Sequence, residues 1–267
     1  MSTLKAGISG IRGIWNDSLT PVDVERAAWA VVLWIRESKL TPRITLGGDP
    51  RPSTATIKDI LTKHLIASGI DILDVGTAPT PTIQFLTKKL QTGMGIAVTA
   101  SHNPSEWNGW KLIRPDGLFF FPPEMKSWIG NWKKANRITS ETEGTISLQA
   151  ASQFLHVDRI LELVDVGAIR ARRLRVAVDC CNGAGSLLLP RLLATLGCDV
   201  IPIHTDPTKP FPRNPEPLPE NLGALSHAVK FNHADIGFAQ DADADRLAIV
   251  NNLGEPIGEE MTLALAV

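Results

Sequence analysis

Short apolar runs and longer segments with helical spacing take turns along this chain of 267 residues. Strands are predicted at 43–47, 70–75, 94–98, 175–179, 199–203 and 234–239, and those at 94–98 and 234–239 are expected to be buried. Helices are predicted where apolar residues recur every three or four positions, after Thr20 and at 54–68, 82–90, 154–164, 186–196 and 220–231. Strands that alternate with helices indicate the α/β fold class with largely parallel sheets.

Local signals mark where several of these elements begin. Thr20, followed by a proline, predicts the N-cap of the first helix, and Ser53 predicts the N-cap of the helix at 54–68. A turn and an apolar run over 114–121 predict a hairpin. Two prolines then open a helix in which Trp128 and Trp132 are expected to anchor the core.

The length of the chain and its 43% hydrophobic content favour two domains. The polar stretch 136–147 has the composition of a connection between them. We therefore expect two consecutive three-layer α/β/α domains with mixed, largely parallel sheets, at 1–145 and 150–257. The proline-rich stretch 205–221 is predicted to be an extended loop.

The composition of the chain limits which binding partners and which cellular compartment we expect. A net charge of -1 disfavours a nucleic-acid surface, and the basic cluster 170–175 is predicted to be a solvated connector. Cys180, Cys181 and Cys198 lack metal-ligand spacing and suit reduced thiols in a core. Because the sequence has neither a signal peptide nor the ~18 apolar residues that span a bilayer, we expect a cytoplasmic protein with no membrane partner.

The first candidate site follows the predicted strand at 94–98, since ligands of α/β folds bind past strand ends. Ser101 lies there with His102 beside it, an Asn-Pro turn after it, and Lys111 further along. A serine hydroxyl is a weak nucleophile, so it needs a base, a metal or prior phosphorylation. A turn without chemistry is an equally good interpretation of these residues taken alone.

The second candidate site follows the strand at 234–239. Asp241, Asp243 and Asp245 alternate with alanines, and Arg246 comes next. Three neighbouring carboxylates repel one another unless a cation lies between them, and hard oxygen ligands suit Mg²⁺. The spacing excludes an EF-hand loop. An acidic loop that is merely solvated is the alternative.

Two further sets of residues are open to more than one interpretation. Arg12 lies in a glycine-rich opening strand at 5–13, where glycines mark bulges or the close approach of another group. Asp49 and Arg51 follow the strand at 43–47 and form either an internal ion pair or a contact with substrate. The motif alone does not choose between these roles.

These motifs together resemble those of the α-D-phosphohexomutases, the family of phosphoglucomutase, phosphomannomutase and phosphoglucosamine mutase. The similarity covers the phosphoserine loop at 99–104 with its following Asn-Gly and Lys111, the Gly-Ile-Arg-Gly at 10–13, the acidic loop at 241–246 and a proline-rich loop. Two departures are Ile8-Ser9, where many members have Thr-Asp, and Ala242, where glycine is usual. The resemblance also explains the glycines at 183–185 without a dinucleotide site.

The resemblance implies a role for each candidate residue. Ser101 would be the phosphoserine, and Mg²⁺ would bind Ser101, Asp241, Asp243 and Asp245. Lys111, Arg12 and His102 are the other catalytic candidates, with His102 orienting the loop and the general base left open. Lys111, Arg12 and Arg246 would bind substrate. The partners would be a hexose phosphate and a hexose bisphosphate, and the reaction would interconvert hexose 1-phosphate and 6-phosphate through phosphoserine and a bisphosphate.

Family members have two further domains, so the resemblance implies that residues 258–267 begin a truncated third domain and that the chain is an N-terminal part whose C-terminal domains are missing. Phosphoglucosamine mutase and phosphomannomutase are the favoured activities, on the soft signal of Glu106-Trp107-Asn108. A non-catalytic Mg²⁺-binding phosphoprotein and a metal-dependent phosphatase are the alternatives. Ser101 would keep its phosphate in the first and pass it to water in the second.

Overall fold

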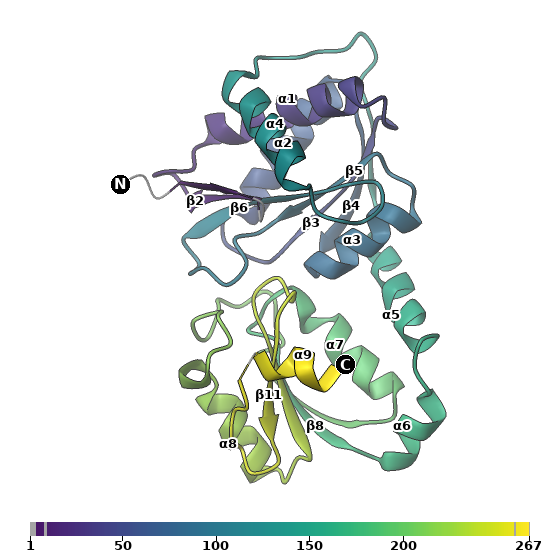
Figure 1. Ribbon diagram of the computed structural model, residues 1–267, viewed down its shortest axis with the longest axis vertical. Coiled ribbons are helices and arrows are strands. Elements are labelled where there is room, and N and C mark those ends of the chain that lie inside the picture. The colour runs from purple at the N-terminus through teal and green to yellow at the C-terminus, as the bar shows by residue number, and fades with distance from the viewer. Residues whose placement is uncertain (1–3, 8–9, 259, 267) are drawn as a thin grey trace. The chain divides into compact units, whose positions relative to one another are not determined.

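The computed structural model describes residues 4–7, 10–258 and 260–266, and helices alternate with strands along most of this length (Figure 1). The positions of Ile8 and Ser9, where the sequence departs from the family pattern, lie outside the described residues. The chain divides into two compact units. Unit 1 comprises Met1–Ala100 and Ser105–Gln153, and unit 2 comprises Ser101–Pro104 and Phe154–Val267. The short loop after Ala100 therefore groups by its contacts with unit 2.

Unit 1 is built on a mixed sheet, whose strand order in the described part of the chain is β1-β2-β6-β5-β3-β4-β7. Strands β3, β4, β5 and β7 pair in parallel, whereas β1, β2 and β6 pair antiparallel with their neighbours. The bounds are β1 Lys5–Gly7, β2 Gly10–Ile14, β3 Arg43–Gly48, β4 Asp71–Thr77, β5 Met94–Val98, β6 Trp107–Ile113 and β7 Ile146–Leu148.

Helices cover both faces of this sheet, so unit 1 has three layers (Figure 1). One face carries α1 (Pro21–Glu37), α2 (Thr54–Ala67) and α4 (Pro122–Lys134), and the other carries α3 (Thr80–Lys89). Strand β5 shows why its sequence is apolar throughout. Ile96 packs in the core beneath α1 and α2, whereas Ala97 packs beneath α3, because successive side chains point to opposite faces.

The two predicted helix caps have different outcomes. Thr20 caps α1 as predicted, because its side chain accepts from the Asp23 N–H at 3.4 Å and the Asp23 carboxylate accepts from the Thr20 N–H at 2.9 Å. The predicted Ser53 cap is wrong, since Ser53 is itself in the helical region and makes no capping bond to α2. Its hydroxyl instead accepts from the buried Asn108 amide at 2.9 Å.

The segment 136–147, which we expected to connect two domains, instead packs on unit 1. The Ser140 N–H donates to the Ala67 carbonyl at 2.9 Å. The Thr145 N–H and hydroxyl donate to Asp71 Oδ1 at 2.9 and 2.7 Å, just before β7 pairs in parallel with β4. An exposed edge strand needs no apolar periodicity, so the composition of this segment was misleading. The chain passes into unit 2 after Gln153.

Two predictions for the stretch after the Ser101 loop also need correction. Residues 107–113, for which no strand was predicted, form β6, which pairs with both β5 and β2. The predicted hairpin over 114–121 is reduced to a bridge between Ile113 and Phe119, and the described residues 118–121 form no strand. The apolar Trp128 and Trp132 do anchor α4 in the core, as predicted.

Unit 2 has a smaller sheet with the order β11-β10-β8-β9 in the described residues. Strands β8, β9 and β10 pair in parallel, and β11 is antiparallel to β10. The strand bounds are β8 Arg175–Asp179, β9 Asp199–Ile203, β10 Ile236–Gln240 and β11 Leu247–Asn251. The helix bounds are α5 Phe154–Leu161, α6 Val166–Arg172, α7 Leu188–Thr195, α8 Gly223–Phe231 and α9 Glu260–Ala266.

The sheet of unit 2 is also covered on both faces. Val176 and Val178 of β8 pack with Leu193 of α7, whereas Ala177 between them packs with Leu225 of α8. The predicted basic connector at 170–175 begins inside α6 and is exposed, as expected.

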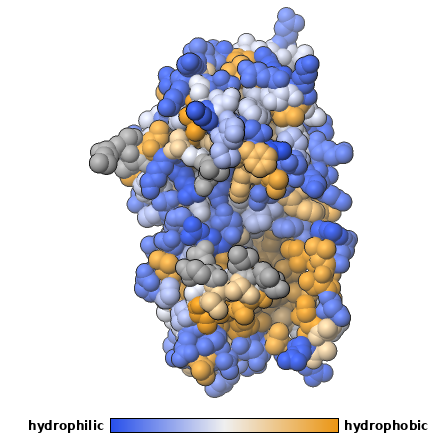
Figure 2. All heavy atoms as spheres, in the orientation of Figure 1, coloured by the Kyte–Doolittle hydropathy of each residue, from blue (hydrophilic) through white to orange (hydrophobic). Residues whose placement is uncertain are grey.

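Apolar side chains remain exposed over unit 2 (Figure 2). Leu187 of unit 2 is 53% exposed and Leu265 is 63% exposed. Of the described helices, none combines the length and the apolar character that crossing a membrane requires.

Candidate functional site

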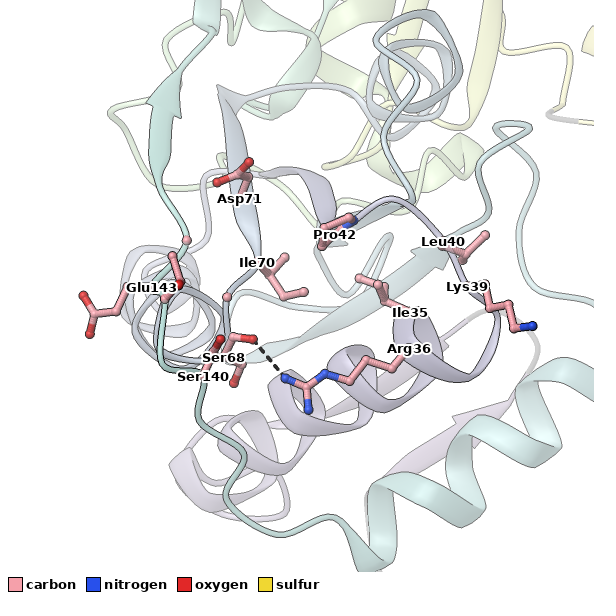
Figure 3. Close-up of a pocket in the computed structure, with 13 residues that line it drawn as sticks. Ile35, Arg36, Lys39, Leu40, Pro42, Ser68, Ile70, Asp71, Ser140 and Glu143 are labelled. Atoms are coloured by element: carbon pink, nitrogen blue, oxygen red, sulfur yellow. Dashed lines mark hydrogen bonds between the residues drawn. The ribbon is translucent and has the colours of Figure 1, made fainter.

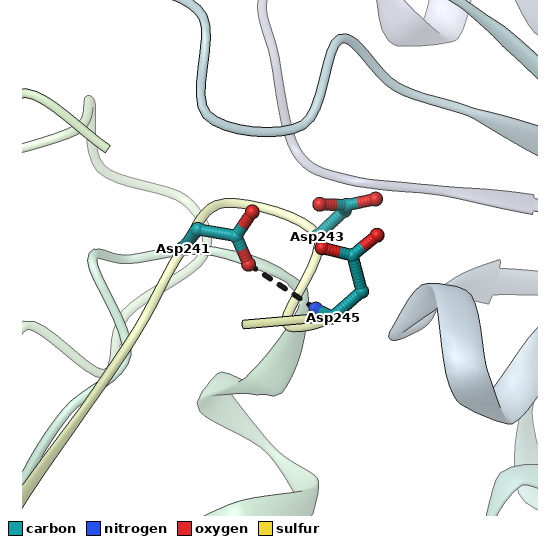
Figure 4. A group of neighbouring side chains, drawn as sticks. All are labelled: Asp241, Asp243 and Asp245. Atoms are coloured by element: carbon teal, nitrogen blue, oxygen red, sulfur yellow. Dashed lines mark hydrogen bonds between the residues drawn. The ribbon is translucent and has the colours of Figure 1, made fainter. Parts of the chain in front are cut away.

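The acidic loop of unit 2 joins β10 to β11. Its three carboxylate side chains, from Asp241, Asp243 and Asp245, each offer an oxygen, and these oxygens lie within 4.8 Å of one another (Figure 4). Asp241 and Asp243 are buried, whereas Asp245 is exposed. The loop therefore presents a compact set of hard oxygen donors with one open side, which fits a divalent cation such as Mg²⁺.

Asp241 organises the loop as well as contributing a donor. Its Oδ1 accepts from the N–H of Asp245 at 3.1 Å, a bond drawn in Figure 4, and from the N–H of Arg246 at 3.2 Å. The chain reverses through Ala244, which has a φ of 57° in the left-handed region. Ala242 is not among the residues with positive φ. The alanine at 242 in place of the usual glycine is therefore accommodated, and the conformational strain falls on Ala244.

The acidic loop packs on the glycine turn at 183–185, which follows β8. The Ala184 N–H donates to the Ala242 carbonyl at 2.8 Å. A Cβ atom on Gly183 would lie 2.5 Å from the Ala242 carbonyl oxygen, and one on Gly185 would lie 1.9 Å from the Gln240 Oε1. Gly183 is needed because the backbone of the acidic loop packs directly on it, whereas the contact at Gly185 is with the end of the Gln240 side chain, which can move. This packing accounts for the glycine turn without a dinucleotide.

Ser101 belongs by its contacts to unit 2, and its hydroxyl reaches the acidic loop. The Ser101 Oγ donates to Asp241 Oδ2 at 3.2 Å and lies 3.4 Å from His102 Nδ1. Ser101 is 2% exposed and has a φ of 55°, a conformation that costs a non-glycine residue about 1–2 kcal/mol. Such outliers cluster at functional sites, where the surrounding structure holds them.

In unit 1, Asp49 and Arg51 form the internal ion pair that was one of two interpretations. The Arg51 Nε lies 2.9 Å from Asp49 Oδ2, with both side chains 0% exposed. The same carboxylate oxygen accepts from the Thr99 hydroxyl at 2.7 Å, and Arg51 Nη1 donates to the Trp107 carbonyl at 3.1 Å. The pair thus ties together the segments on either side of the 101–104 loop, from Thr99 at the end of β5 to the start of β6.

Arg12 and Lys111 lie on one face of the unit 1 sheet. Arg12 of β2 is directly opposite Gly109 of β6, and Lys111 is two positions beyond Gly109, where the side chain returns to the same face. A Cβ on Gly109 would lie 1.8 Å from the Ile11 carbonyl oxygen, so this glycine permits the close pairing of the strands. Lys111 is 3% exposed, with its Nζ 5.8 Å from the Phe119 ring centre.

A second charged network, around Asp179, was not predicted from the sequence. Asp179 ends β8 and is fully buried, with its carboxylate 3.1 Å from Arg213 Nε and 3.0 Å from His204 Nδ1. Arg213 Nη2 also donates to Asp179 Oδ1 at 3.2 Å. A charged residue at the end of an apolar strand was the available signal, but its partner lies in the proline-rich loop 34 positions away.

A hollow of about 610 Å³ in unit 1 lies at the opposite end of the strands (Figure 3). It adjoins Pro42 before β3 and Asp71 at the start of β4, and Arg36 on its wall donates to the Ser68 carbonyl at 3.3 Å. Ligands of parallel sheets bind beyond the carboxyl ends of strands, whereas this hollow adjoins the amino ends. None of the predicted site residues lines it.

The two folds and the two loops define a class: α/β proteins with a serine and a cluster of carboxylates placed at strand ends. Comparison with known families then makes the class specific. The model of phosphoglucomutase/phosphomannomutase α/β/α domain I matches residues 3–137, and that of domain II matches residues 155–254. The chain belongs to this family, the α-D-phosphohexomutases, whose members are isomerase enzymes and generally depend on a metal.

Individual relatives agree. A phosphoglucomutase/phosphomannomutase of Thermococcus kodakarensis is 39% identical over 97% of this chain and 58% of its own length. A probable phosphoglucosamine mutase of Methanosarcina acetivorans is 38% identical over 97% of this chain and 57% of its own. The crystal structure of a putative phosphomannomutase from Thermus thermophilus superposes with a TM-score of 0.87 and 26% identity, covering 100% of this chain and 62% of that one. The chain thus spans little more than half the length of these curated relatives.

Proposed function

We propose that this chain carries the phosphoserine and the metal site of a phosphohexomutase that interconverts hexose 1-phosphate and hexose 6-phosphate. The proposal is carried by one observation, the 3.2 Å hydrogen bond from the Ser101 hydroxyl to Asp241 in the acidic cluster. A phosphoryl group on Ser101 would add charge beside three carboxylates. Such an arrangement is tolerable only if a cation is shared between them.

The chemistry assigned to Ser101 consists of two reciprocal phosphoryl transfers. In the first, the bond between phosphorus and the Ser101 Oγ breaks while a bond to a substrate hydroxyl oxygen forms, and the hydroxyl proton passes to a base. The product is a hexose bisphosphate. After this bisphosphate reorients, its other phosphoryl group returns to the Ser101 Oγ, and the isomeric monophosphate leaves.

The proposed ligands of Mg²⁺ are Asp241, Asp243, Asp245 and an oxygen of phosphorylated Ser101. Carboxylate and phosphate oxygens in a set smaller than the full octahedron suit this ion, which keeps water in its remaining positions. When bound, the ion would neutralise the charge that develops on the transferring phosphoryl group. The protein residues fix where that charge develops, because Asp241 holds both the loop backbone and the Ser101 hydroxyl.

The cationic residues have proposed roles in binding. Arg246 would contact the phosphate on Ser101 through its planar guanidinium group, since it directly follows the last carboxylate of the loop. Arg12 and Lys111 would supply positive charge to the substrate from one face of the unit 1 sheet. Lys111 is the better candidate for proton transfer, because a lysine ammonium can give up a proton in a protein whereas an arginine guanidinium stays charged. His102 would orient the Ser101 hydroxyl from 3.4 Å.

The favoured substrates are glucosamine phosphate and mannose phosphate. The names of the relatives from Methanosarcina acetivorans and Thermococcus kodakarensis support this choice, as does the Glu106-Trp107-Asn108 sequence after the phosphoserine loop. Cytoplasmic location belongs to the same proposal, because phosphorylated sugars of this kind are intracellular metabolites.

Intact-mass spectrometry of the chain mixed with Mg²⁺ and a hexose 1,6-bisphosphate, of glucosamine or of mannose, tests the proposal. We expect the mass to rise by one phosphoryl group, and the rise to disappear in Ser101→Ala and after chelation of the metal. Ser105→Ala is the matched control, since Ser105 is an exposed serine of the same loop region. Phosphorylation that persists in Ser101→Ala would contradict the assignment.

The phosphorylated chain then distinguishes the competing functions. Adding glucosamine 6-phosphate or mannose 6-phosphate should remove the phosphoryl group and form the bisphosphate, as a mutase requires. Release of inorganic phosphate alone would indicate a phosphatase. A phosphoryl group that stays on Ser101 under every condition would indicate a non-catalytic phosphoprotein.

A further inference from the structure

The proline-rich loop of unit 2 contacts the acidic loop at both of its ends. The contacts are made by Arg213 and Glu216, three positions apart. Arg213 reaches the residue before the first carboxylate, Gln240, and Glu216 reaches the residue after the last one, Arg246. The two residues that are contacted, Gln240 and Arg246, flank the acidic cluster and do not belong to it.

The contact made by Arg213 is the more buried of the two. The Arg213 Nη2 donates to the Gln240 carbonyl at 2.8 Å while the Arg213 side chain forks onto the buried Asp179 carboxylate. The side chain is only 8% exposed. Asp179 is opposite Ala239 in the parallel pairing of β8 and β10, so it anchors Arg213 beside the point where the chain leaves β10. The backbone just before Asp241 is thereby held to the sheet.

The contact made by Glu216 is an ion pair at the surface. The Arg246 Nη1 lies 3.3 Å from Glu216 Oε1, and both side chains are about a third exposed. The Pro215 carbonyl accepts from Arg213 Nη1 at 3.1 Å, which links the two contacts within the proline-rich loop.

We propose that Arg213 and Glu216 are positioning residues that hold the acidic loop in the conformation in which its three carboxylates converge. The inference rests on the metal site of the proposed function. It follows from the conflict inside the loop, where like charges repel and Ala244 occupies the left-handed region, so that the free loop would open. Arg213 acts by geometry, because the Asp179 carboxylate offsets its charge.

An internal control tests whether Arg213 does more than stabilise unit 2. Arg175 bonds the Asp199 carboxylate at 2.7 Å and the Asn232 carbonyl at 3.1 Å, so it makes the same two kinds of contact. It begins β8, whereas Asp179 ends that strand. Arg213→Lys and Arg175→Lys each keep the charge and remove the guanidinium group, but only the first does so beside the acidic loop. Arg175 is 48% exposed and Arg213 8% exposed, so the unfolding midpoint of each variant is measured as well, to separate a loss of stability from a loss of metal affinity.

The experiment titrates the whole chain with Mn²⁺, which shares the oxygen preference of Mg²⁺ and is counted by electron paramagnetic resonance of the free ion. We expect Arg213→Lys to raise the dissociation constant about tenfold or more, the range for residues that orient metal ligands. Arg175→Lys should change it less than about twofold, and Glu216→Gln should raise it roughly threefold, as an ion pair whose side chains are about a third exposed allows. Hydrogen exchange measured on metal-free protein should rise over 240–246 in Arg213→Lys alone of the two arginine variants.

Each result decides between outcomes. Folded Arg213→Lys that binds Mn²⁺ as tightly as wild type, with unchanged exchange over 240–246, overturns the inference. If wild type binds no Mn²⁺, the proposed metal site is wrong, and the hydrogen exchange over 240–246 alone decides whether Arg213 holds the acidic loop. If Arg213→Lys does not fold, Glu216→Gln decides: a raised dissociation constant with an unchanged unfolding midpoint supports the inference, and an unchanged constant overturns it.

Discussion

Replacing Asp49 by asparagine tests the ion pair that joins Thr99 and Trp107, the segments of unit 1 on either side of the 101–104 loop. The change keeps the size of the side chain and leaves an amide oxygen that can still accept from the Thr99 hydroxyl. It removes the negative charge that Arg51 faces at 2.9 Å, with both side chains fully buried. The guanidinium group would then remain in the protein interior without its compensating charge.

The magnitude follows from that burial. Breaking a buried pair by removing one partner costs about 3–5 kcal/mol, because the remaining charge stays desolvated. Thr99→Val removes only one neutral donor to the same carboxylate and should cost about 1 kcal/mol. Since a domain is stable by roughly 5–15 kcal/mol, Asp49→Asn should remove a large fraction of the free energy of unfolding of unit 1.

Urea unfolding followed by tryptophan fluorescence isolates this effect, because every tryptophan of the chain lies in unit 1. The seven residues are Trp15, Trp29, Trp34, Trp107, Trp110, Trp128 and Trp132. With a urea slope of about 2 kcal/mol/M, a loss of about 3 kcal/mol lowers the midpoint by about 1.5 M.

Arg43→Gln is the control, since it removes an ion pair to Asp71 whose side chains are 47% and 35% exposed. Such a pair is worth about 0–1 kcal/mol. If Asp49→Asn lowers the fluorescence midpoint no more than Arg43→Gln does, the buried pair does not support the loop and the reasoning is wrong.

Three further outcomes are expected. Ala244→Gly should raise the stability of unit 2 by up to about 1 kcal/mol by relieving its left-handed strain, whereas Ala242→Gly should lower it by about 0.5–1 kcal/mol; circular dichroism in urea compares them. Hydrogen bonds from the Thr145 hydroxyl and N–H lower the pKa of Asp71 below its ordinary 3.8, so their contribution to stability is complete above pH 3.8 and is lost as pH falls through the lowered pKa. The loss of stability caused by Thr145→Val, measured in urea, should therefore be full at neutral pH and shrink below pH 3.8. A loss that stays constant with pH would contradict the assignment. Burial raises the pKa of the Cys180 thiol, so iodoacetamide at mildly alkaline pH should leave Cys180 unmodified in the native chain and label it in urea; labelling in the native state at the rate of a free thiol would refute its burial.

Strands buried on both faces were the elements that the sequence predicted best. The runs at 94–98 and 175–179 have the same bounds in the structure as β5 and β8, whose residues are buried apart from Arg175. The predicted strand at 199–203 also has the bounds of β9, but β9 is an edge strand whose residues are half-buried or exposed. A strand covered by helices on both sides is apolar throughout, so its signal lies within its own residues. The candidate donors were equally visible, because the types and spacing of Asp241, Asp243 and Asp245 express their chemistry directly.

Elements whose polar residues find distant partners were missed. Strand β6 includes Asn108 and Lys111, and Asn108 can be buried there because its amide donates to Ser53 and Thr54, more than 50 positions earlier. The same bond takes the Ser53 hydroxyl away from α2, which explains the wrong cap. Strand β7 is an exposed edge, where pairing with β4 replaces any apolar pattern.

The sequence by itself thus determined the fold class, the buried strands and the types of the candidate site residues, because periodicity and residue type are local properties. Only the tertiary structure decided which groups meet. It brings the Ser101 hydroxyl to Asp241 across 140 positions, moves the backbone strain from residue 242 to Ala244, and assigns Arg213 to the Gln240 carbonyl. The physical reason is that a buried polar group must find a partner somewhere, and packing of distant segments decides which one it finds.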